Sequence, residues 1–199
     1  GSNRNTETHF DIFSANGEKY LVMYFAFNQP GSKGYSAAYE KRMLNWADSV
    51  LAANADRKAI LVAHSMLGRP KGTTSGDKPG GGDNNKESNF TAQGKGIYEM
   101  AKNHDNVFLM LGGHIAGEGF RKDTFKGNVI KTYLQDYQSR QSEPYGGSKD
   151  RNGGSGTMRL MRLNKTKQTI SILTFTPQPN GTVIREQDGD SEFTHPLYK

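Results

Sequence analysis

Two short apolar segments, with a helical segment between them, constrain the fold of this chain most. Residues 58–63 (Lys-Ala-Ile-Leu-Val-Ala) and 107–111 (Val-Phe-Leu-Met-Leu) each have the length of a buried strand. Residues 91–103 have the pattern of a helix, which Thr91 can cap. A strand–helix–strand unit is parallel and right-handed in nearly all proteins. Both strands should therefore end at one edge of a sheet, which is where open α/β sheets bind ligands.

Hydrophobic periodicity assigns further elements around this unit. Residues 10–14 and 19–27 predict a hairpin that turns at Asn16-Gly17, because Asn-Gly suits positive φ angles. Ser36 is predicted to cap a helix that ends near Ala53. Its apolar stripe is Tyr39, Met43, Trp46 and Val50. Two more hairpins are predicted at residues 120–135 and 157–176, and the polar tail from residue 177 to 199 is expected to wrap the surface. We expect one α/β domain over residues 1–199, with a mixed β-sheet and its two main helices on one face.

The composition excludes several classes of site. The chain has no cysteine, which excludes disulfides, thiolate metal ligands and cysteine nucleophiles. No segment approaches the ~20 apolar residues of a membrane span, so no membrane contact is expected. The net charge is +6, but the basic residues are scattered, which disfavours a nucleic-acid partner. The 24 glycines predict long loops, and we expect residues 68–88 and 145–156 to be flexible. Gly1-Ser2 is typical of the remnant of a cleaved expression tag.

Two histidines directly follow the two strands of the central unit. His64 follows residues 58–63, and His114 follows Gly112-Gly113 at the end of the second strand. Neutral imidazole is a common protein ligand for zinc, iron or manganese. The two side chains can converge at the sheet edge as metal ligands, or they can merely cap the strand ends through hydrogen bonds. The residue pattern alone favours neither interpretation.

Ser65, beside the first histidine, offers a different chemistry. A serine at a strand end is typical of the nucleophile elbow Gly-x-Ser-x-Gly of α/β-hydrolases, although Ala63 and Leu67 replace both glycines here. With a histidine within hydrogen-bond reach, Ser65 would act as the nucleophile of a metal-independent carboxylesterase. The simpler interpretation is a hydroxyl that bonds the loop backbone. Near His114, Arg121 is a candidate for holding a phosphate or carboxylate, and Glu118 is a second candidate for binding substrate.

The order of these motifs resembles the C-terminal half of the calcineurin-like metallophosphoesterases. The strand-end His64 and the Gly-Gly-His114 loop resemble the histidine motifs of that family. Five further segments are similar to a bacterial, often exported, branch of it: Gly-Phe-Arg-Lys-Asp-Thr at 119–124, Asp-Tyr-Gln at 136–138, Thr-Met-Arg-Leu at 157–160, Thr-Phe-Thr-Pro at 174–177 and Asp-Ser-Glu-Phe at 190–193.

The resemblance implies a partial metallophosphoesterase-type sandwich and a hydrolase that attacks phosphoester bonds through a metal-activated water. It also implies His64 and His114 as ligands of a divalent Zn, Mn or Fe ion, a small ester or phosphoester substrate, and an exported or periplasmic location. The family's Asp-x-His, Gly-Asp-x-x-Asp and Gly-Asn-His motifs are absent, and Ala116 stands where a second loop histidine is expected. Glu118 is a candidate replacement for that ligand.

The departures leave the predicted metal site incomplete. His64 and His114 both map to the same one of the family's two metals, so we expect weak metal binding by this chain alone. Its expected partner is a missing N-terminal half or a second copy of the chain, because half a fold leaves apolar surface uncovered. A further alternative is a catalytically inert fragment that serves as an interaction module.

Overall fold

The computed structural model describes residues 8–70, 88–138 and 156–198. Its main sheet has six strands in the order β1-β2-β3-β6-β8-β7. The bounds along this order are β1 His9–Ala15, β2 Glu18–Phe25, β3 Lys58–Ala63, β6 Val107–Gly112, β8 Asn128–Asp136 and β7 Gly117–Phe125. β1 pairs antiparallel with β2, whereas β2–β3 and β3–β6 are parallel. The predicted mixed sheet and the central parallel unit are confirmed.

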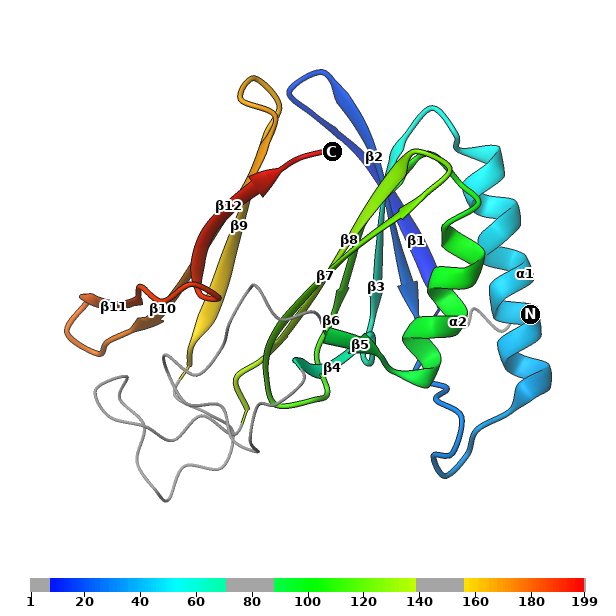
Figure 1. Ribbon diagram of the computed structural model, residues 1–199, viewed down its shortest axis with the longest axis horizontal. Helices are drawn as coiled ribbons and strands as arrows, with labels where there is room; N and C mark the ends of the chain where they lie inside the picture. The colour runs from blue at the N-terminus through cyan, green and yellow to red at the C-terminus, as the bar shows by residue number, and fades with distance from the viewer. Residues whose placement is uncertain (1–7, 71–87, 139–155, 199) are drawn as a thin grey trace, which may run out of the picture. The chain divides into compact units, whose positions relative to one another are not determined.

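Two helices cover one face of this sheet (Figure 1). They are α1 Ala37–Ala53 and α2 Ala92–Ala101. Ser36 and Thr91 cap them, and each side-chain oxygen accepts the backbone N–H three residues later, which satisfies one of the free donors of a first helical turn. Both helix starts and their caps agree with the sequence prediction. The fold class is therefore α/β with two main helices on one face.

The described residues group into two compact units. The first contains residues 8–67, 90–113 and 122–133, and the second contains residues 68–70, 88–89, 114–121, 134–138 and 156–198. The core of the first unit is apolar and joins both helices to the sheet. In α1 the fully buried residues are Met43, Ala47 and Leu51. Of the predicted apolar stripe, Met43 is buried, whereas Tyr39, Trp46 and Val50 are only partly buried. The buried face of α1 is therefore displaced by about one residue from the predicted one.

Met66 packs so closely against two positions of the first unit that both must be glycine. A Cβ on Gly94 would lie 2.0 Å from the Met66 carbonyl oxygen, and a Cβ on Gly112 would lie 2.7 Å from the Met66 side chain. Both positions therefore accept only glycine without a shift of the neighbouring chain. Gly94 weakens the helix locally, yet it permits α2 to pack directly against the segment that follows β3.

The second unit contains a four-stranded sheet built on β10 Thr169–Pro177. Its other strands are β9 Met158–Asn164, β11 Val183–Glu186 and β12 Glu192–Pro196. β9 pairs along one side of β10, so β11 and β12 must share the other side. Thr174 pairs with Glu186, and the adjacent Leu173 pairs with Glu192. Residues 187–191 therefore bulge out between two consecutive pairs.

Two expectations about loops and tail need correction. The tail does not merely wrap the surface, because β11 and β12 join the sheet and bury Glu186, Asp190 and Ser191. The ends of the predicted loop 68–88 are strands, since β4 Leu67–Pro70 pairs with β5 Ser88–Phe90. The rest of that loop, and all of the predicted loop 145–156 except Gly156, lie outside the described residues. Within the described ranges, neither helix has the length and apolarity to cross a membrane.

Candidate functional site

The ends of β3 and β6 lie side by side, as the parallel unit predicted. The N–H of Gly113 donates to the carbonyl oxygen of His64 at 3.0 Å, so the hydrogen bonding of the sheet continues past both strand ends. The His64 side chain is exposed, and its ring packs edge-on against Phe27 with 5.3 Å between ring centroids. His64 is therefore fixed in backbone position while its imidazole faces solvent.

His114 begins the second unit with an unusual backbone conformation. Its φ angle is +70°, in the left-handed region that non-glycine residues seldom occupy. The side chain is exposed. Strain of this kind costs of order 1–3 kcal/mol and concentrates at functional sites. The conformation is thus a physical reason, beyond the sequence pattern, to regard this loop as a candidate site.

Ser65 is buried and already hydrogen-bonded. Its side chain has no exposed surface, and its hydroxyl donates to Oε1 of Gln29 at 2.6 Å. A serine nucleophile must give that proton to a base and must also be reached by substrate. The observed contact commits the proton to an amide oxygen that cannot act as a base. The hydroxyl thus has a hydrogen-bonding role, as in the simpler interpretation, but its acceptor is the side-chain amide of Gln29 and not the loop backbone.

Arg121 and Glu118 lie on β7, in the second unit, and differ in exposure. Arg121 is half-buried and donates from Nη1 to the Ser88 carbonyl oxygen at 3.2 Å. The Glu118 residue is only 7% exposed. A carboxylate so deeply buried presents little surface to a substrate, so its location favours a role inside the unit.

Glu118 is the centre of a buried polar network. Its carboxylate forms an ion pair with Arg159, and the two side chains are 4% and 1% exposed. The Tyr137 hydroxyl donates to Oε1 at 2.7 Å, and the Ser191 hydroxyl lies 3.0 and 3.1 Å from the two carboxylate oxygens. Arg159 also donates to Thr174 Oγ1 at 3.2 Å. Burial raises the pKa of the Tyr137 phenol well above its usual range, which keeps it a neutral donor.

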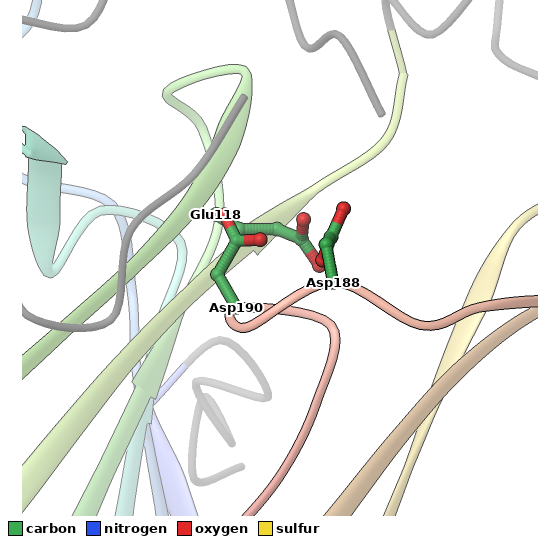
Figure 2. Close-up of side chains that lie close together, drawn as sticks. All are labelled: Glu118, Asp188 and Asp190. Carbon is green, nitrogen blue, oxygen red and sulfur yellow. The ribbon is translucent and has the colours of Figure 1, made fainter. Parts of the chain in front are cut away.

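Two aspartates add negative charge beside this network. Asp188, Asp190 and Glu118 offer carboxylate oxygens that lie within 4.8 Å of one another, and Figure 2 shows the three side chains turned toward one another. Burial raises the pKa of Asp190 to about 8, with further contributions from the Asp188 carboxyl and the charge of Glu118. We call Glu118, Asp188 and Asp190 the acidic triad. Among the residues that the structure describes, it is the one cluster of three or more potential metal ligands.

Sequence reasoning did not find the acidic triad as a unit. It singled out Glu118 but missed Asp188, and it noted Asp190, Arg159 and Tyr137 as parts of family-like segments. The structure brings four of those segments together: 136–138, 157–160, 174–177 and 190–193 all contribute a contact to the network. The available signal was Asp188-Gly-Asp190, since aspartates at alternate positions in a loop are typical of oxygen-ligand metal sites.

A separate hollow lies in the four-stranded sheet. It has a volume of about 430 Å³ and is partly open, and its lining includes Leu160, Arg162, Leu173, Arg185 and Glu192. An ion pair between Arg185 and Glu192 spans part of it. The hollow contains none of the side chains that the sequence singled out for catalysis or metal binding.

No protein-family model matches this chain. Among curated proteins it is 26% identical over 184 residues to the uncharacterized protein YvnB of Bacillus subtilis (strain 168). That match covers 89% of this chain and 12% of YvnB, so the chain spans a small part of its relative's length.

Two solved structures match this chain over most of its length. A dimetal phosphatase from Danio rerio matches with a TM-score of 0.50 and 10% identity, over 96% of this chain and 61% of the phosphatase. GAP50, the anchor in the inner membrane complex of Plasmodium, matches with a TM-score of 0.42 and 12% identity, over 96% of this chain and 53% of GAP50. The six-stranded sheet with its two helices thus resembles the metallophosphoesterase fold.

Proposed function

We propose that this chain is the histidine-bearing part of a phosphoester hydrolase, with His64 and His114 as ligands of a catalytic divalent metal. The observation that carries the proposal is the paired end of β3 and β6, where Gly113 bonds His64 and is followed directly by His114. The likeness in fold to a dimetal phosphatase supports the same chemistry. The left-handed backbone of His114 supports a functional role for its loop.

The residues described do not by themselves fit a two-metal centre. Such a centre needs several anionic ligands to hold two cations. The acidic triad, which is the ligand group found among the described residues, contains neither histidine. Two neutral imidazoles would hold one metal weakly. We therefore propose that the remaining ligands come from outside the described residues; the match covers only 61% of the phosphatase, which agrees with this.

When bound, a metal would supply an activated water and would stabilise the charge that develops on a phosphoryl group. His64 and His114 would hold it through ring nitrogens. Arg121, with a guanidinium that is partly accessible, remains a candidate to orient a phosphate. Ser65 is proposed to position the loop after β3 through its bond to Gln29 and to take no part in the chemistry.

A chromogenic phosphodiester and a chromogenic short-chain ester test the proposal together. We expect Mn²⁺- or Zn²⁺-dependent phosphodiesterase activity, lost with chelator and reduced at least tenfold in His64→Ala and in His114→Ala. His9→Ala is the matched control, because His9 lies in β1, stacks on Tyr24 of β2 and is not part of the proposed site. A longer piece of the natural gene should be more active and should retain metal through purification. Ester hydrolysis that resists chelator and disappears in Ser65→Ala would instead establish the serine esterase.

The predicted self-association stays a proposal, and β1 supports it. Every residue of β1 is exposed, and Phe10, Ile12 and Phe13 are 41%, 52% and 46% exposed on this edge strand. An exposed apolar edge favours pairing with another chain. Light scattering should show a dimer or larger species that Phe10→Lys with Ile12→Lys converts to monomer, whereas a monomer at all concentrations would contradict the proposal.

A further inference from the structure

We propose that Glu118, Asp188 and Asp190 form a calcium-binding site in the second unit. Each residue offers a carboxylate oxygen, and the three oxygens lie within 4.8 Å of one another. Figure 2 shows that one side chain comes from β7 and two come from the bulge at residues 187–191. The proposal is independent of phosphoester hydrolysis, since it uses neither His64 nor His114.

The state of Asp190 points to a ligand. The residue is 4% exposed, and its Oδ1 accepts no hydrogen bond from any residue that the structure describes. The nearby guanidinium of Arg159 does not donate to Asp190 Oδ1. Its Nη2 donates instead to the Asp190 backbone carbonyl oxygen, at 2.7 Å, and to the Glu118 carboxylate. A buried carboxylate oxygen without a donor is costly, and a cation between the carboxylates would satisfy it.

The charges of the cluster match a divalent ion. Arg159 supplies one positive charge to three carboxylates. When all three carboxylates are ionised, two negative charges remain uncompensated, and because they lie close together and largely out of water they repel each other. A dication would balance them. Asp188 is only half-buried, so it gives the ion a route from solvent.

The donor set selects calcium among common divalent ions. All three ligands are oxygens, which favours hard cations over zinc or copper. Calcium bonds of about 2.3–2.6 Å place ligands on opposite sides of the ion about 5 Å apart, and a span of 4.8 Å fits inside that sphere. Magnesium needs bonds of about 2.0–2.1 Å in near-octahedral geometry and gives up its waters reluctantly. A buried cluster on a loop therefore suits calcium better.

Calcium titration of the chelator-treated full chain tests the site directly. We expect a heat of binding that saturates near one calcium ion per chain. We also expect a rise in Tm of about 5 °C at calcium concentrations well above Kd. Asp190→Asn should abolish both effects while leaving the calcium-free Tm equal or higher, because asparagine keeps the shape and removes a buried acidic group. A residue with a merely structural role would lower that Tm. Asp11→Asn, on exposed β1, should bind calcium like the unmodified chain.

Terbium luminescence provides a second measurement that needs no activity. Tb³⁺ is a calcium substitute that nearby tyrosines sensitise, and the Tyr137 hydroxyl lies 2.7 Å from Glu118 Oε1. The tyrosine-excited signal should appear in the unmodified chain, fall on addition of excess calcium, and be lost in Asp190→Asn and greatly reduced in Tyr137→Phe. The proposal is overturned if Tm is the same in calcium and in chelator, if Asp190→Asn still binds calcium, or if magnesium gives an equal shift at equal concentration.

Discussion

The two units bury different kinds of side chain. In the first unit the fully buried residues include Leu21, Leu61 and Met110, and they pack between sheet and helices. In the second unit the most deeply buried groups include the ion pair of Glu118 with Arg159. Apolar burial is non-directional, so it is lost in proportion to the area removed. A buried ionic network depends on every partner, because each group left alone pays its full desolvation cost. The first unit should therefore respond to mutation gradually and the second abruptly.

The largest effect is expected at the buried ion pair. Arg159→Met should lower the free energy of unfolding by about 4 kcal/mol, because it leaves Glu118 charged and buried. Urea denaturation measures the change. The double variant Arg159→Met with Glu118→Gln should recover much of the loss, since the uncompensated charge is gone. A loss below about 1 kcal/mol in the single variant would remove the contrast between the units.

Truncation in the apolar core should cost somewhat less. Leu61 in β3 is fully buried, and Leu61→Ala should lower the free energy of unfolding by about 3 kcal/mol through lost contacts and a cavity. Leu61→Met, which nearly conserves volume, should cost about 1 kcal/mol. The comparison predicts that these two costs scale with the volume removed. Equal costs for both variants, measured in the same denaturant series, would contradict the graded response.

Two glycines of α2 allow a test of close packing within the first unit. Gly94→Ala should destabilise by about 2 kcal/mol, because its Cβ would meet the Met66 carbonyl oxygen at 2.0 Å. Gly96→Ala is the matched control. Its Cβ would lie 3.1 Å from Oε1 at the end of the long Glu40 side chain, which needs to shift by only a few tenths of an ångström. The better helix propensity of alanine should therefore stabilise by up to about 1 kcal/mol. Thermal denaturation should show shifts of opposite sign, and shifts of the same sign would refute the close contact.

Lys131 is a charged residue buried in the otherwise apolar first unit, and it should make the stability of that unit depend on pH. It is 1% exposed, and burial, with the nearby charge of Lys122, lowers its pKa to about 8, from about 10.4 in an unfolded chain. Between these pH values the unfolded chain binds more protons, so the free energy of unfolding should rise with pH, by about 1 kcal/mol per unit. Lys131→Met should flatten that rise. An unchanged pH dependence in the variant would mean that another group titrates.

The sequence predicted the first unit well because its signals are periodic and local. The apolar runs of β3 and β6, the caps at Ser36 and Thr91, and the turn at Asn16-Gly17 were all found where they had been expected. Both turn residues have positive φ, at +51° and +71°. The short strands β4, β5 and β11 were missed, because three or four residues are too few to show an alternating pattern. β12 was missed too, because the polar tail was expected to wrap the surface.

The candidate sites were predictable to different degrees. The position of His64 at a strand end follows from the parallel unit, which hydrophobic pattern alone reveals. The network around Glu118 joins β7, β9, β10 and the loop before β12. Its partners are up to 73 residues apart, and no local pattern indicates which distant polar residues will meet. Only the antiparallel pairing of β9 with β10, and the return of the chain through β12, bring them together.

The register of β10 has a consequence for engineering. Because Glu186 and Glu192 face consecutive residues of β10 and run in the same direction, the chain enters and leaves the 187–191 segment as though on one uninterrupted strand. The segment also makes contacts of its own, because the Thr174 N–H donates to the Ser191 carbonyl oxygen and the Ser191 hydroxyl donates to Glu118. A loop grafted between the same two residues would keep the strand direction on both sides, and it would have to replace these contacts to keep the buried network intact.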